Sequence, residues 1–222
     1  MRVPDIDFQD IKPVLAVAAL IAWCYLPSIL RRTWVALGHL IGVATATELG
    51  GFLVMIFGYH NLWIYNTFLL VQLPLILRLI HSMTWSKGLR TWGKWLLALR
   101  IIVTLGEIGT KSFTEELYNS TALLDGTIVT GLFVVLLFTL SNEDLEPIYH
   151  SPKFWVALAF VLFYGPTIPL YGLITYLTER NVRLASQLYV INDILFILFY
   201  SILIMVLSRM IPAGMKVIKH VG

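Results

Sequence analysis

The sequence predicts an all-α integral membrane bundle of seven transmembrane helices, with the N-terminus outside and the C-terminus in the cytoplasm. Hydrophobic residues make up 58% of the 222 residues and charged residues only 13%, against roughly 45–50% and 25% in soluble domains. Long apolar stretches recur seven times, and Lys and Arg gather on alternate connections between them. Because helices and short connections use nearly the whole chain, we expect a single domain over residues 1–222.

Seven stretches have about the length that a membrane crossing requires. A helix needs about 20 apolar residues to cross the hydrocarbon region. We expect spans near residues 11–30, 34–59, 62–80, 92–110, 122–140, 154–177 and 184–210. The fourth is interrupted by Arg100 and Glu107. If it failed to span, six helices would remain and both chain ends would share one side.

The distribution of Lys and Arg favours seven spans, because cytoplasmic connections carry an excess of these residues. One side receives ten of them: Arg31, Arg32, Arg78, Lys87, Arg90, Lys94, Lys153, Arg209, Lys216 and Lys219. The other side receives five: Arg2, Lys12, Lys111, Arg180 and Arg183. The first side is therefore expected to be cytoplasmic.

The segment 84–95 alternates Trp with Lys and Arg. This composition is typical of a stretch at the cytoplasmic membrane surface, with Trp at headgroup depth and cations near anionic lipid. We expect contact with the lipid bilayer here. A binding site for a signalling partner is the alternative. No feature points to nucleic acid, since the net charge of +3 is small and scattered.

Polar residues recur three or four positions apart inside the predicted spans, so they share helix faces. Four carboxylates lie within apolar segments: Glu48, Glu107, Asp125 and Asp193. The third span carries Tyr65, Asn66 and Gln72, the fourth Arg100, Thr104, Glu107 and Lys111, and the last two Tyr164, Tyr171, Asn192 and Asp193. An ionisable group in the hydrocarbon region is costly unless it faces a partner or a wet cavity. The stripes are therefore expected to point inward.

Depth along the spans predicts where these groups meet. Glu48, Gln72 and Tyr164 fall near the middle of the membrane. The residues in its outer half are Tyr65, Asn66, Glu107, Asp125, Tyr171, Asn192 and Asp193. We predict that polar groups of six helices converge on one outer-half polar cavity. Its expected ligand-binding residues are Glu48, Tyr65, Asn66, Gln72, Asp125, Tyr171, Asn192 and Asp193. Arg100 and Glu107 are expected to form structural ion pairs, and Glu107 with Lys111 is an alternative i,i+4 pair.

A structural interpretation of the same residues remains open, because polar side chains also hold membrane helices together. Several chemistries are disfavoured. The five histidines are scattered without i,i+3 or i,i+4 pairs, and no metal or other cofactor is expected. A retinal pigment requires a buried lysine in the last span, and residues 184–210 contain none.

Three short stretches resemble a family of bacterial seven-helix membrane proteins whose function is not established. They are Asn61-Leu-Trp-Ile-Tyr-Asn66, Ser151-Pro-Lys-Phe-Trp155 and Leu188-Tyr-Val-Ile-Asn-Asp-Ile-Leu195. The resemblance implies the same fold in a bacterial inner membrane and an association with membrane signalling systems.

The leading functional hypothesis is a receptor-like sensor. It would bind a small ligand or cation in the outer-half cavity and signal to a membrane or cytoplasmic partner. One alternative is a membrane-embedded lipid-modifying hydrolase that uses paired carboxylates, Asp125 with Asp193. The other is a small-solute or proton-coupled transporter, which requires a path continuing past Gln72 and Tyr200.

Overall fold

The computed structural model describes residues 8–84, 86–114, 116–143, 148–178, 180 and 182–221. The described residues form eight α-helices and one short 3-10 helix, with no strand. The helices are α1 (Phe8–Cys24), α2 (Ser28–Thr33), α3 (Val35–Ile56), α4 (Leu62–Met83), α5 (Lys87–Thr110), α6 (Asn119–Glu143), η1 (Ile148–His150), α7 (Pro152–Thr178) and α8 (Val182–Val221). The all-helical class predicted from the sequence is confirmed.

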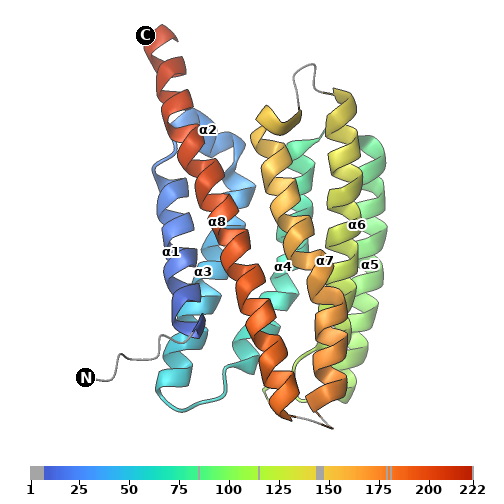
Figure 1. Ribbon diagram of the computed structural model, residues 1–222. Coiled ribbons are helices and arrows are strands. Elements are labelled where there is room, and N and C mark those ends of the chain that lie inside the picture. The colour runs from blue at the N-terminus through green and yellow to red at the C-terminus, as the bar shows by residue number, and fades with distance from the viewer. Residues whose placement is uncertain are drawn as a thin grey trace, which may run out of the picture.

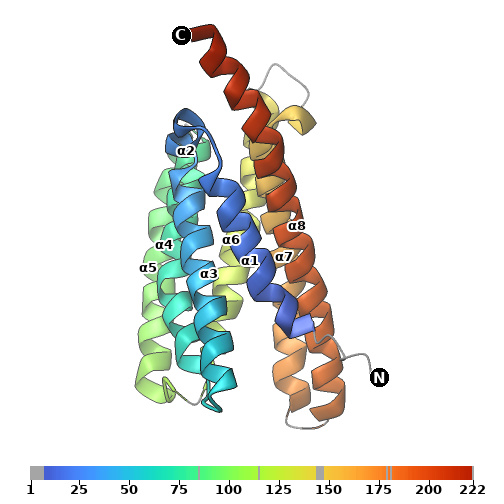
Figure 2. The ribbon, with the colours of Figure 1, turned by 90° about the vertical axis from the view of Figure 1, so that its left-hand side faces the viewer.

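Seven long helices run side by side and alternate in direction along the bundle (Figure 1). Six of them close a ring in the order α1, α3, α4, α6, α7 and α8, with α8 packing back on α1. The helix α5 lies outside this ring, against α4 and α6. In the second view α1 lies between α3 and α8 (Figure 2). The ring arrangement leaves an interior that six helices share and α5 does not.

The chain ends of the described part lie at opposite ends of the bundle. The helix α1 begins toward one end, called here the N-terminal end, and α8 finishes beyond the other, the C-terminal end (Figure 1). The last turns of α8 extend past the neighbouring helices in both views (Figures 1 and 2). A single helix of 40 residues therefore connects the two ends.

The helix boundaries correct the first predicted span. Residues 11–30 do not form one helix, because α1 ends at Cys24 and α2 begins at Ser28. Pro27 lies between them as the N-cap of α2. Proline disfavours helical backbone at the residue before it, which ends the helix here. The fourth predicted segment is longer than expected and begins at Lys87.

Five of the described helices are long and apolar enough to cross a membrane: Val35–Ile56, Leu62–Met83, Asn119–Ser141, Pro152–Leu173 and Gln187–Pro212. A shorter apolar helix covers Ile11–Cys24. The helix α5 is not among them, and it carries Lys94, Arg100 and Glu107. By composition the chain is a multi-pass membrane protein. Seven crossings and their orientation stay predictions.

Large apolar side chains are exposed along the middle of the helices, as a lipid environment requires. Ile102 is 67% exposed, Leu105 61% and Phe138 71%. The helix α5 thus presents an apolar outer face although its inner face is charged. Prolines inside α4 and α7 (Pro74, Pro166 and Pro169) are compatible with membrane helices, whose neighbours can satisfy the freed backbone groups.

The helices α1 and α3 approach closely where the chain folds back. Trp23 packs on Gly38, where an added Cβ would lie 2.1 Å from the indole ring. The Trp23 indole N–H donates to the Trp34 carbonyl at 3.2 Å. Only glycine leaves room for this ring, so Gly38 allows α1 to lie against α3.

The apolar core fills the half of the bundle toward the C-terminal end. Its most buried side chains include Leu37, Leu73, Ile76, Phe133, Leu136, Phe160, Leu203 and Leu207. The rings of Phe133 and Phe160 stack with centroids 4.4 Å apart. The other half of the bundle, toward the N-terminal end, contains a cavity.

Candidate functional site

A cavity of about 490 Å³ lies inside the six-helix ring. Its described lining comes from α1, α3, α4, α6, α7 and α8, with Asn61 just before α4 and Leu117 just before α6, and none of it from α5. The polar lining residues are Lys12, Thr47, Glu48, Asn61, Tyr65, Gln72, Asp125, Tyr164, Thr167, Tyr171, Tyr189, Asn192 and Tyr200. Polar groups of six helices therefore converge, as predicted, but one of the six helices differs from the prediction. The first helix contributes to the cavity, and the fourth predicted span does not.

The cavity is closed toward the C-terminal end and reaches the surface at the other. Leu37, Ile41 and Leu203 belong both to its lining and to the buried core. Met55 and Tyr189 also line it, and they are 43% and 47% exposed. Both lie near the N-terminal end of the bundle, at the end of α3 and the start of α8. Access is therefore from that end.

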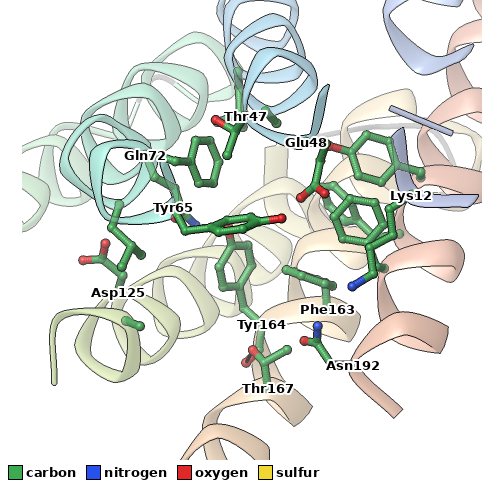
Figure 3. Close-up of a pocket in the computed structure, with 18 of the residues that line it drawn as sticks. Lys12, Thr47, Glu48, Tyr65, Gln72, Asp125, Phe163, Tyr164, Thr167 and Asn192 are labelled. Atoms are coloured by element: carbon green, nitrogen blue, oxygen red, sulfur yellow. Dashed lines mark hydrogen bonds between the residues drawn. The ribbon is translucent and has the colours of Figure 1, made fainter. Parts of the chain in front are cut away.

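Glu48 projects from α3 into the cavity (Figure 3). The Tyr65 hydroxyl of α4 points toward its carboxylate and is within hydrogen-bonding reach. Lys12 and Asp193 are the charged side chains that act on it electrostatically. Among the described residues, no Lys, Arg or His nitrogen forms a salt bridge with Glu48. It is the acid of the cavity wall that lacks an ion pair.

Lys12 and Asp193 join α1 to α8 beside Glu48. The Lys12 ammonium forms a salt bridge with the Asp193 carboxylate, and it lies 5.7 Å from the centroid of the Phe196 ring. Lys12 lines the cavity, while Asp193 is not part of the lining. From the sequence, Lys12 is expected only among the cations of the outer side. The one local signal was its position a single residue inside the first apolar stretch.

Asn192 contributes a polar atom without a partner. Its side chain lines the cavity on α8 (Figure 3) and the residue is only 9% exposed. In the described part of the structure, its Oδ1 atom accepts no hydrogen bond. A buried acceptor without a donor is uncommon in folded proteins. This atom therefore marks a place where an additional donor would be favourable.

Gln72 and Tyr164 form the inner polar contact of the cavity. The Gln72 amide nitrogen of α4 donates to the Tyr164 hydroxyl of α7, across the interior of the six-helix ring. The Tyr164 ring lies parallel to Phe160, with centroids 6.0 Å apart. Tyr171 and Tyr200 also line the cavity, and both interact electrostatically with Glu48. Gln72 is thus tied into the wall.

Asp125 lies at the cavity wall but is held by Arg100. The Arg100 Nε atom donates to Asp125 Oδ1 at 3.2 Å and an Nη atom donates to Oδ2 at 3.4 Å. The Arg100 guanidinium also donates to the Leu69 carbonyl of α4. Arg100 is only 3% exposed and Asp125 only 1%. Asp125 is therefore a paired acid that the cavity touches.

Arg100 and Glu107 both form ion pairs, but each pairs with another residue and not with the other. Glu107 accepts from Lys111 Nζ at 2.7 Å, which is the i,i+4 alternative. It also accepts from the backbone N–H groups of Ser120 and Thr121 at 3.0 and 2.8 Å. A carboxylate at a helix start satisfies N–H groups that have no partner within the helix. Glu107 therefore caps α6.

Thr104 does not line the cavity either. Its hydroxyl oxygen lies 3.1 Å from that of Thr121. Arg100, Thr104, Glu107 and Lys111 of α5, with Thr121 and Asp125 of α6, form one continuous set of contacts. We call this set the α5–α6 ladder. Every described member has a hydrogen-bond or ionic partner. It explains how a charged helix packs beside apolar ones.

Asn66 lies outside the cavity lining, in contrast to its predicted ligand-binding role. Its amide nitrogen donates to the carbonyls of Phe113 and Glu116 at 2.9 and 2.8 Å. Its Oδ1 accepts from the Tyr118 N–H at 3.1 Å. The side chain is fully buried. Its hydrogen-bonding capacity is used to hold the connection between α5 and α6.

The arrangement limits the chemistry of the site. Asp125 and Asp193, the acids of the hydrolase hypothesis, are each paired with a different cation. The described residues contain no group of three or more His, Cys, Asp or Glu that could hold a metal ion. The described lining offers one carboxylate without a salt bridge, one amide oxygen without a donor, and several hydroxyl groups within an aromatic wall.

Comparison with known proteins identifies no relative. No family model, curated protein or solved structure matches the chain. The resemblance to bacterial seven-helix membrane proteins therefore stays a prediction.

Proposed function

We propose that the chain is a receptor-like membrane protein that binds a small molecule in the six-helix cavity. The observation that carries this proposal is the cavity itself, enclosed by six helices and closed at one end by packed side chains. Its volume of about 490 Å³ falls within the range typical of small-molecule sites. In the proposed topology its opening faces outside, and the membrane is a bacterial inner membrane.

Closure of the cavity favours a receptor over a transporter. A transport path would continue past Gln72 and Tyr200 toward the C-terminal end. That region is filled by Leu73, Ile76 and Leu207, all at or near zero exposure. The hydrolase alternative has less support, because both of its acids are ion-paired.

The helix α8 offers a route for signalling. It contributes Tyr189 and Asn192 to the cavity and extends beyond the bundle at the other end (Figure 1). A ligand that shifts α8 at the cavity would move its far end, where a membrane or cytoplasmic partner would respond. The exposed Trp92 and Trp95 on α5 lie toward the same end of the bundle. Trp85, which belongs to the segment 84–95 where the sequence suggests a partner site, lies outside the described residues.

Two phenylalanine substitutions on α3 test binding in the cavity. Ala44 lines the cavity, whereas Ala46 faces outward and is exposed. Thermal unfolding of the purified protein in detergent would be measured with three probes of similar size: 2-phenylethylamine, 2-phenylethanol and phenylacetate. We expect at least one probe to raise the unfolding temperature of the wild type and of Ala46→Phe. Ala44→Phe, whose cavity is filled, would not respond.

Equal responses of the two variants would place the probe on the outer surface or in the micelle and would contradict the proposal. So would the absence of stabilisation by all three probes. Signalling has a separate readout, the amide hydrogen exchange of residues 205–221 with and without the stabilising probe. An unchanged exchange rate there would leave binding intact and contradict transmission through α8.

A further inference from the structure

The balance of charge around the cavity indicates what kind of molecule it would bind. Asp125 is neutralised by Arg100, and Asp193 by Lys12. Glu48 has electrostatic contact with Lys12, but this cation forms its salt bridge with Asp193. Counting these five groups as ionised, two positive and three negative charges leave a net charge of −1. An unpaired carboxylate in a membrane interior is costly, so an additional cation would be stabilised there.

The second observation is the Asn192 Oδ1 atom. It is a buried acceptor on the cavity wall that has no donor among the described residues. An N–H donor from an occupant would satisfy it, and unsatisfied buried acceptors are destabilising. An occupant that carries a positive charge and an N–H donor would therefore interact favourably with both Glu48 and Asn192.

The wall supplies the third observation. Eleven of the described lining residues are aromatic, among them Phe52, Phe163, Phe199 and Tyr171. Aromatic faces attract cations and also provide apolar contact. Lys12 already lies over the Phe196 ring, which shows that a cation is accommodated beside this wall. An inorganic ion would leave most of this apolar surface without a partner, and no cluster of metal ligands is found in the described part.

We propose that the cavity binds a small organic amine in its protonated form, with the ammonium group between Glu48 and Asn192 and the apolar body among the aromatic side chains. This inference rests on the proposed function and names the class of ligand for the same site. The ammonium would donate to Glu48 and to Asn192 Oδ1. The Lys12–Asp193 pair would remain intact beside it.

The three probes distinguish the ligand class because they share a phenyl body and differ in charge. Dissociation constants would be obtained at pH 7 from the concentration dependence of the unfolding temperature. We expect 2-phenylethylamine to bind about tenfold more tightly than 2-phenylethanol, because a charge-assisted hydrogen bond and the cation attraction are added. Phenylacetate would bind more weakly than the alcohol, since Glu48 repels it.

Glu48→Gln tests where the ammonium lies. The variant should lose the preference for the amine while its affinity for 2-phenylethanol is retained, and this retained affinity confirms that it is folded. Glu116→Gln is the matched control, because Glu116 is an exposed acid outside the cavity lining. It should keep the wild-type preference. Asn192→Leu should weaken amine binding about threefold relative to the alcohol, by loss of one acceptor.

Each result decides between the proposals. Equal affinity for the amine and the alcohol would overturn the ligand class and leave cavity binding standing. Tighter binding of phenylacetate would identify an anion as the occupant, drawn by Lys12, and would also overturn it. A preference for the amine that survives Glu48→Gln would place the ammonium elsewhere. Failure of all three probes would overturn the proposed function as well.

Discussion

The α5–α6 ladder and the cavity wall are built from the same kinds of residue but differ in how completely these are paired. In the ladder, Arg100 meets Asp125, Thr104 meets Thr121 and Glu107 meets the start of α6. In the cavity wall, Glu48 has no salt bridge and Asn192 has an unused acceptor, within the described residues. A polar stripe in a membrane helix therefore does not by itself indicate function. Incomplete pairing beside an open volume is the better sign.

The largest effect is expected from breaking the buried pair of the ladder. Arg100→Met would leave the Asp125 carboxylate buried without its cation and should destabilise the protein by about 3–5 kcal/mol. The measurement is unfolding by sodium dodecyl sulfate in mixed micelles. The double variant Arg100→Met/Asp125→Leu removes both charges and should recover most of this loss. A double variant as unstable as the single one would show that the pair is not the source of the stability.

The α5–α6 ladder also shows how far a sequence can predict such a site. The spacing of Arg100, Thr104, Glu107 and Lys111 correctly indicates one shared helix face, because local geometry fixes it. The partner of Arg100 depends instead on which helix packs alongside and at what register. Asp125 reaches it from α6, and this contact has no local signature. The sequence therefore predicts an ion pair for Arg100 but not its partner.

The same limit explains why Lys12 was missed and Asn66 was misassigned. Lys12 belongs to the site because the first and last long helices pack together, a contact between distant parts of the chain. Asn66 shares a helix with two cavity residues, Tyr65 and Gln72, but faces the connection before α6. Glu48 was found from its depth alone, since an acid in the middle of an apolar stretch is costly wherever the helix packs.

A smaller effect is expected from the ion pair beside the cavity. Lys12→Met leaves Asp193 without its cation and should destabilise the protein by about 1–3 kcal/mol. The loss should be less than that of Arg100→Met, because the Lys12 side chain is 18% exposed against 4% for Arg100. Once the Lys12 side chain is truncated, water can reach Asp193 by the partly exposed position of the lost ammonium group, whereas Arg100 and Asp125 are both almost fully enclosed.

The double variant Lys12→Met/Asp193→Asn isolates the charge, because it removes the unpaired carboxylate while keeping a side chain of similar shape. It should recover part of the loss in the same micelle titration. If Lys12→Met were as destabilising as Arg100→Met, the two regions would be equally enclosed. The contrast between the enclosed pair of the ladder and the more accessible Lys12–Asp193 pair would then be wrong.

The smallest effect is expected from Thr104→Val, which removes the hydroxyl contact in the middle of the ladder. An interhelical hydrogen bond between membrane helices contributes about 0.6 kcal/mol on average, and a loss of about that size should appear in the same titration. Thr127→Val on α6 is the matched control. Its hydroxyl is exposed and bonds only to Leu123 of its own helix, so its stability should stay near that of the wild type.

This last comparison is the sharpest test of how the ladder works, because it separates charge from hydrogen bonding. If the Thr104→Val loss is small while the Arg100→Met loss is large, the ladder is held by its buried ion pair. The threonines then serve mainly to leave no polar atom unpaired between the charged contacts. A Thr104→Val loss as large as that of Arg100→Met would mean that the ladder behaves as one cooperative network. Pairing of individual residues would then be too simple a criterion for separating structural from functional polar groups in this bundle.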